Sequence, residues 1–160
     1  ISNSGKADSD NSLSLVKSTA QTLNKAVADL RDTDFDTASD DDIKSKVKAF
    51  VDGYNSTLTS TKNMNSYSIL QTELWATKQV GVNAGLLNDI GISIDENNKL
   101  TLDEEKLKKA DKGTLKSLFS GSGSLAAQIA QKSASLVNLS TNQLAVNSGK
   151  STYTSSGTLR

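Results

Sequence analysis

The sequence predicts a mainly α-helical protein, a helical bundle with one short β-hairpin packed on it. Proline is absent from the 160 residues, so no helix is interrupted by one. Apolar residues recur at helical spacing along most of the chain, which favours long amphipathic helices. The period switches to two at about residues 92–102, which indicates the hairpin.

Three regions are expected along the chain. Residues 1–10 form a disordered or polar lead, because Ser, Asn, Gly and Asp offer turns and caps but no core. Residues 11–149 form a single helical core domain with the hairpin. Residues 150–160 lack periodicity and are expected to form a flexible tail. With only 35% apolar residues, one modest core is the most that this composition supports.

The first and last helices are expected to be coiled-coil-like. Apolar residues in the first helix alternate at spacings of four and three, which puts one narrow stripe along it. The last helix carries its apolar residues among Ser, Thr, Asn and Gln, with Lys132 almost its only charge. The two stripes can pair within one chain or between copies, and their width is compatible with both. The candidate assembly stripes are Val16, Leu23, Val27, Leu30, Leu125, Ile129 and Leu136.

Two further helices lie between them. Residues 43–58 carry a wider apolar face, as expected for a helix packed on a core. Phe50 and Tyr54 lie four apart on that face and are expected in the core rather than in a ligand pocket. A third helix is expected to present Leu70, Leu74, Ala84 and Leu87 to the bundle. Its two glycines, Gly81 and Gly85, predict an early end or a close helix contact.

The hairpin is predicted from alternation on both sides of a turn at Asn97-Asn98. Two strands are marginal in water, so their apolar face must lie against a helix. Asp103 can cap the helix that follows. The expected core and hairpin residues are Phe50, Tyr54, Ile92, Ile94, Leu100 and Leu102.

The aspartate-rich segment Asp32–Asp42 has two interpretations. In the first it is a loop that caps the next helix, because Ser39 and Asp40 can accept hydrogen bonds from free backbone amides. In the second, Asp32, Asp34 and Asp36 bind calcium as in an EF-hand. Thr37 stands where that loop needs glycine and Ile43 where it needs glutamate, so the cap is the favoured interpretation.

Composition argues against several classes of function. The chain contains no His and no Cys, so neither an enzyme nor a metal or other cofactor is expected. Its formal net charge of zero gives no general attraction to nucleic acid. No apolar run approaches the roughly 20 residues of a membrane helix, so membrane insertion is not expected either.

Two stretches together carry a resemblance to a known family. The first is Phe50-Val51-Asp52-Gly53-Tyr54-Asn55. The second is Leu87-x-x-Ile90-Gly91-Ile92-x-x-Asp95-x-x-x-Lys99-Leu100-x-Leu102-Asp103-x-x-Lys106-Leu107. In order and spacing they resemble the C-terminal conserved region of the bacterial flagellar filament cap family, also called hook-associated protein 2. The resemblance covers about Ala38 to Phe119.

The resemblance implies an extracellular structural protein of the flagellum, exported by flagellar type III secretion without a cleaved signal. In the family, a ring-like homo-oligomer sits at the filament tip, assists flagellin assembly and so serves cell motility. Flagellin and hook-associated proteins are the implied partners, and no catalytic residue is carried over. Neither the family's N-terminal leg nor its variable outer domain is evident, which implies a short form or a core fragment. The alternative is a monomeric helical binding or adhesion module that recognises a surface or another flagellar protein.

Overall fold

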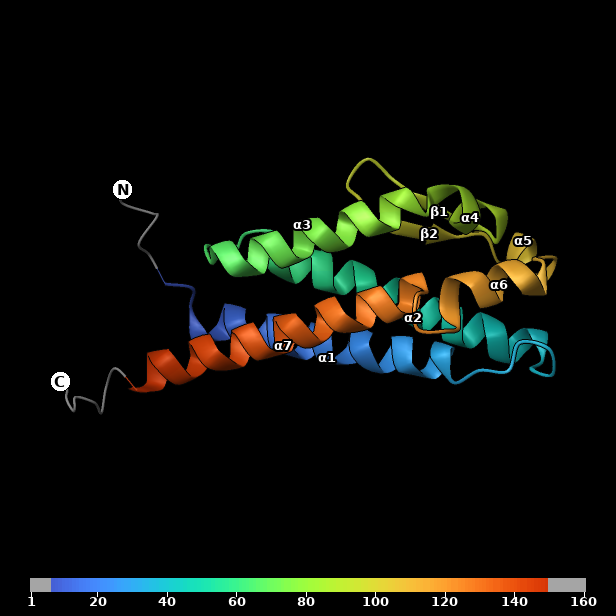
Figure 1. Ribbon diagram of the computed structural model, residues 1–160. Helices are drawn as coiled ribbons and strands as arrows, with labels where there is room; N and C mark the ends of the chain where they lie inside the picture. The colour runs from blue at the N-terminus through green and yellow to red at the C-terminus, as the bar shows by residue number, and fades with distance from the viewer. Residues whose placement is uncertain (1–6, 150–160) are drawn as a thin grey trace.

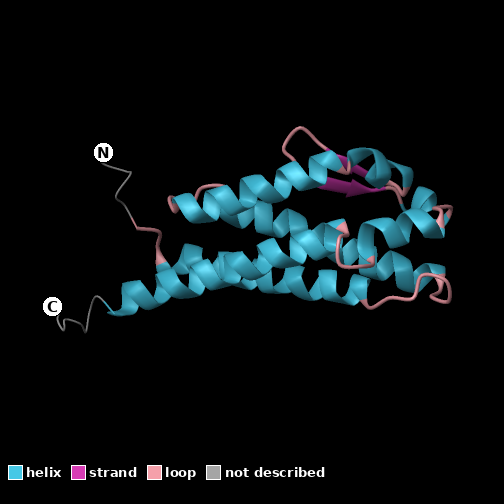
Figure 2. Ribbon diagram, in the orientation of Figure 1, coloured by secondary structure: helices cyan, strands magenta, loops and turns pink. Residues whose placement is uncertain are grey.

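A computed structural model describes residues 7–149 as long helices with one antiparallel hairpin (Figures 1 and 2). The predicted tail and residues 1–6 of the predicted lead lie outside the described residues. The elements are α1 (Asp10–Arg31), α2 (Asp40–Thr61), α3 (Tyr67–Val82), α4 (Ala84–Asp89), β1 (Ile92–Ile94), β2 (Leu100–Leu102), α5 (Glu104–Lys108), α6 (Lys112–Phe119) and α7 (Leu125–Gly149). The predicted fold class, mainly helical with a short hairpin, is confirmed.

The four long helices lie side by side along one axis (Figure 1). α1 and α7 run antiparallel and form the most extensive contact between any two elements, followed by α1 with α2. α3 lies on the other side of α7 and also touches α2. The hairpin and the short helices α4 to α6 gather at the end of the bundle opposite the start of α1 and the end of α7 (Figures 1 and 2).

Most helices begin at a side chain that accepts a backbone hydrogen bond. Ser9, Ser39, Ser66, Asp103 and Asp111 each accept from the amide three residues on, at the starts of α1, α2, α3, α5 and α6. Because the first amides of a helix lack intrahelical partners, these caps fix where each helix starts. The predicted caps at Ser39 and Asp103 are both present.

The third helix ends early, which is one of the two predicted outcomes at its glycines, but its orientation differs from the sequence prediction. α3 ends at Val82, and the separate α4 begins at Ala84. A Cβ added at Gly81 or Gly85 would meet nothing within 4 Å, so the glycines mark an early end and not a close helix contact. Leu74 was expected to face the bundle but is 48% exposed, because Ile69 and Val80 take the buried face instead.

The folded unit begins earlier than the predicted boundary at residue 11. Asp8 is buried, and its two carboxylate oxygens accept from the backbone amides of Asn65 and Ser66 at 2.6 and 3.0 Å. These bonds tie the start of the described chain to the connector between α2 and α3. A polar residue of this segment therefore forms part of the folded unit.

Buried apolar residues form two clusters along the bundle. The larger cluster lies at the hairpin end and contains three phenylalanines in edge and tilted contact. The ring centroids of Phe119 lie 6.2 Å from Phe35 and 5.8 Å from Phe50. The smaller cluster lies at the opposite end, near the start of α1, and consists of Leu13, Val16, Ala20, Met64, Ile69 and Leu136.

Gly91 joins α4 to β1 in a conformation that requires glycine. Its φ is +98°, and a Cβ there would lie 2.6 Å from the carbonyl oxygen of Asp103. The Gly91 carbonyl also accepts from the amide of Asp103 at 2.7 Å. The start of the hairpin and its exit are therefore in direct backbone contact.

We expect Gly91→Ala to lower the free energy of unfolding by more than the roughly 1–2 kcal/mol that a left-handed residue costs on its own. Urea denaturation measures the loss. Gly121→Ala is the matched control, because Gly121 has a φ of +92° but open space around its Cβ position. Equal losses in the two variants would contradict the close contact at Gly91.

Candidate functional site

The candidate assembly stripes are packed against each other inside the chain. None of the seven residues is more than 3% exposed. Val16 and Leu136 lie in the smaller cluster, and the other five lie in the larger one. Of the two pairings left open by the sequence, the structure contains the pairing within one chain. A second copy could reach these side chains only if the bundle opened.

A set of polar contacts lies between the two apolar clusters; we call it the polar layer and define it by Thr19, Asn24, Ser60, Thr61, Glu73 and Ser133. Asn24 of α1 donates from Nδ2 to the carbonyl of Ala130 at 3.0 Å and to Ser133 Oγ at 2.9 Å on α7. The hydroxyls of Thr19 and Ser60 join α1 to α2 at 2.8 Å. Thr61 donates to Glu73 at 3.1 Å and joins α2 to α3. Because hydrogen bonds are directional, these contacts fix how the helices align lengthwise.

The side chain of Tyr54 ends at the polar layer but makes no hydrogen bond to it. Its side chain is 2% exposed, and its hydroxyl has no hydrogen-bond partner within the described residues. The ring borders a cavity of about 20 Å³ that Glu73, Ser133 and Leu136 also line. Burial, and secondarily the negative charge of Glu73, raise the pKa of Tyr54 above its usual value. The phenol is therefore held in its neutral form.

The two stretches that carry the family resemblance meet at one joint between α2 and the hairpin. The side chain of Asn55 donates from Nδ2 to the Leu100 carbonyl and accepts at Oδ1 from the Leu100 amide, both at 2.8 Å. Asn55 thus pairs with the free edge of β2 as a neighbouring strand would. Its role was not predicted, because a single Asn on a helix has no periodic signal.

The predicted core and hairpin residues lie together at this joint. Phe50, Tyr54, Ile92 and Leu100 are buried. Ile94 and Leu102 are partly buried and pack on the same cluster. The strands pair in antiparallel register, with Ile92 opposite Leu102 and Ile94 opposite Leu100. The hairpin thus lays its apolar face on the bundle, as two marginal strands require.

The hairpin turn is held by one aspartate side chain. Asp95 Oδ1 accepts from the amides of Asn97 and Lys99 at 2.7 and 3.0 Å. Asn98 adopts a φ of +65°, a conformation that Asn tolerates better than most residues. The predicted turn at Asn97-Asn98 therefore lies where the alternation indicated.

The aspartate-rich segment serves the helix start and a surface ion pair. Ser39 Oγ accepts from the Asp42 amide, and Asp34 Oδ1 accepts from the Asp36 amide. Asp36 also meets Lys116 of α6 at 2.6 Å, and this hydrogen bond raises the pKa of Lys116. Among residues 7–149, no three His, Cys, Asp or Glu side chains are grouped so that they could hold a metal ion.

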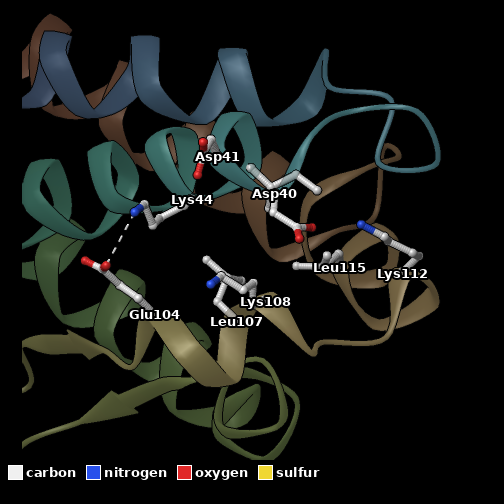
Figure 3. Close-up of a pocket in the computed structure, with 9 residues that line it drawn as sticks. Asp40, Asp41, Lys44, Glu104, Leu107, Lys108, Lys112 and Leu115 are labelled. Carbon is white, nitrogen blue, oxygen red and sulfur yellow. Dashed lines mark ion pairs between the residues drawn. The ribbon is translucent and has the colours of Figure 1, made fainter.

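A charged cleft lies between the start of α2 and the helices α5 and α6 (Figure 3). Lys44 Nζ lies 3.6 Å from a carboxylate oxygen of Glu104 across it, and Leu107 and Leu115 form its buried lining. The cavity measures about 10 Å³, which is space for no more than one water molecule. The ion pair therefore joins α2 to α5, and the cleft has no room for an organic ligand.

The outward side of α3 carries exposed apolar side chains; we call it the α3 face and define it by Tyr67, Gln71, Leu74, Lys78 and Val82. At 100° per residue they fall within an arc of about 80°. Tyr67 is 75% and Val82 78% exposed. The sequence prediction missed this face because it directed Leu74 inward. The unused signal was the spacing of Tyr67, Leu74 and Val82 at about two turns.

Within residues 7–149, no helix combines the length and apolar character needed to cross a membrane. No protein-family model, curated protein or solved structure matches the chain. The α2–hairpin joint and the α3 face are therefore the features from which function is inferred.

We expect Asn55→Ala to lower the free energy of unfolding by about 2 kcal/mol, because it leaves both backbone groups of Leu100 unpaired. Hydrogen exchange of the Leu100 amide should accelerate by more than the global destabilisation explains. Ser56→Ala, on the exposed neighbouring position, is the control. If the Leu100 amide exchanged at the same rate in both variants, its hydrogen bond with the side chain of Asn55 would be refuted.

We expect Tyr54→Phe to make stability less sensitive to alkaline pH. In the unfolded chain the phenol ionises near pH 10, whereas in the folded protein its pKa is higher. Above pH 10 the unfolded state therefore binds fewer protons, and the wild type loses stability by up to about 1.4 kcal/mol per pH unit from this group. Denaturation from pH 8 to 11 measures the difference from wild type. Tyr67→Phe, at an exposed position, is the control, and parallel profiles for wild type and Tyr54→Phe would contradict the assignment.

Proposed function

We propose that this protein is a structural subunit of the bacterial flagellum, a filament-cap-like protein that assists flagellin assembly at the filament tip. The observation that carries the proposal is the spatial meeting of the two stretches that resemble the family. They are separated by more than thirty residues in the sequence. The side chain of Asn55 in the first stretch forms two hydrogen bonds with the backbone of Leu100 in the second. The residues that carry the resemblance therefore form one contiguous part of the fold.

Several residues in this part of the fold are of a type that the local geometry requires. At Gly53 a Cβ would lie 3.2 Å from the Leu23 Cα, so α2 passes α1 closely there. Gly91 and Asp103 are in backbone contact at 2.7 Å, and Asp103 also caps α5. Because geometry requires these residue types, the residues that carry the resemblance are more specific than the apolar residues common to all helices. They support a shared core with the cap family.

Under this proposal the protein acts outside the cell after flagellar type III export and contacts flagellin and its own copies. The stripes of α1 and α7 are filled within the chain, so contacts between folded copies must use the outer surface. Exposed apolar side chains on α3 and α4 are available there: Tyr67, Leu74, Val82 and Leu86.

A monomeric binding or adhesion module is the second candidate, and one cleft favours it. A cavity of about 310 Å³ opens between α2, α3 and the hairpin turn. Lys62, Glu73, Asn97 and Lys99 line it together with apolar residues. Its size reaches the lower end of the range for small-ligand pockets, roughly 300–1,000 Å³.

Gold-labelled protein added to flagellin filaments from the source organism tests the proposal by electron microscopy. We expect label at one filament end, displaced by unlabelled protein, together with faster growth from that end when flagellin monomer is added. Label distributed along the filament sides would instead support the binding module. No specific label at any molar excess would refute the filament-cap proposal.

A further inference from the structure

Three of the six large exposed apolar side chains among the described residues lie on one helix face. Among the described residues, the large exposed ones are Leu15, Tyr67, Leu74, Val82, Leu86 and Val146. Three lie on the α3 face and Leu86 follows on α4, whereas Leu15 and Val146 lie on α1 and α7. Scattered single residues are normal on a surface, but a row along one helix indicates an interaction site.

α3 is well placed to meet another molecule. It forms an outer edge of the bundle (Figure 1), and only Ile69 and Val80 are buried among its residues. Lys78 is the only charged residue among its exposed positions. A partner on this face therefore gains apolar contacts and must accommodate a single positive charge.

The order of residues on the α3 face is self-complementary in the antiparallel direction. Tyr67 lies seven residues before Leu74, and Val82 lies eight residues after it. Gln71 lies three before Leu74, and Lys78 four after it. Turning a second copy end over end about a point beside Leu74 therefore sets Tyr67 against Val82 and Gln71 against Lys78.

Charge selects this arrangement over the parallel one. In a parallel pair, Lys78 would face Lys78 of the other copy, and like charges in direct contact are unfavourable. In the antiparallel pair each Lys78 faces the neutral amide of Gln71, whose oxygen can accept its hydrogen bond. Both copies then satisfy the same contacts, as a twofold interface requires.

We propose that the α3 face binds a second copy of this chain, with the two α3 helices antiparallel about a twofold axis beside Leu74. Such an interface closes with two copies and does not by itself build a ring. It therefore goes beyond the proposed flagellar function. Because Leu74 also lines the cleft of about 310 Å³, a ligand in that cleft and a second copy on the α3 face would compete.

The size of the face indicates weak association. Its apolar contacts come from three side chains on one helix, whereas a stable interface uses roughly 20–30 residues on each partner. A stable interface buries roughly 800 Å² on each partner. The pair is therefore expected to dissociate on dilution.

The chain contains no cysteine, so single cysteines report the geometry directly. Under mild oxidation at high concentration, Leu74→Cys should form a covalent dimer, because the axis brings this position against itself. Tyr67→Cys alone should not, whereas a mixture of Tyr67→Cys and Val82→Cys should form the mixed dimer. Leu15→Cys is the matched control, since Leu15 is 53% and Leu74 48% exposed.

Equal crosslinking of Leu74→Cys and Leu15→Cys would overturn the proposal, as would self-crosslinking of Tyr67→Cys.

Sedimentation without a crosslink gives a second measurement. We expect Leu74→Asp to raise the Kd of the wild-type dimer by about tenfold or more, with Leu15→Asp unchanged. A wild type that stays monomeric at every concentration refutes the dimer. The gold-labelling result at filament ends is independent of either outcome.

Discussion

The antiparallel contact between α1 and α7 is the constraint on which the rest of the structure depends. It joins segments more than one hundred residues apart, and Asn24 holds it near the middle through Ala130 and Ser133. Asn147 holds it near the termini, donating to the Asp8 carbonyl and to the Asp10 carboxylate at 3.3 and 2.9 Å. Closing so long a loop costs conformational entropy, which only extensive burial can offset. Both apolar clusters contain residues from α1 and α7, so both depend on this contact.

The hairpin joint follows from that contact in two steps. α1 first fixes α2, because the two backbones approach closely at Gly53 and Leu23. α2 then offers Asn55 to the free edge of β2, and the backbone contact at Gly91 sets the angle at which the hairpin leaves α4. Two strands of three residues would be unstable alone. They persist because a helical side chain supplies the hydrogen bonds of a third strand.

Local signals in the sequence account for the features that were predicted. The switch of period at Ile92 and Leu100 and the capping residues Ser39 and Asp103 act within a few positions, so one sequence suffices to recognise them. The partner of the α1 stripe and the role of Asn55 depend on residues far away in the chain, and no local spacing encodes them. The direction of Leu74 was missed for a different reason. Apolar residues spread widely around α3, so its pattern does not distinguish an inner from an outer face.

The residues that resemble the cap family and the residues available to partners are separate sets. Phe50, Gly53 and Gly91 lie inside the fold, where geometry restricts the residue type. Tyr67 and Val82 lie outside the two quoted stretches and are largely exposed. A protein could therefore retain the joint while its outer surface changed partners. Because fold is inherited through the core whereas function lies in surface sites, kinship and function are separate questions for this protein. Substitutions at the joint address how the fold is held together, and substitutions on the α3 face address what the protein binds.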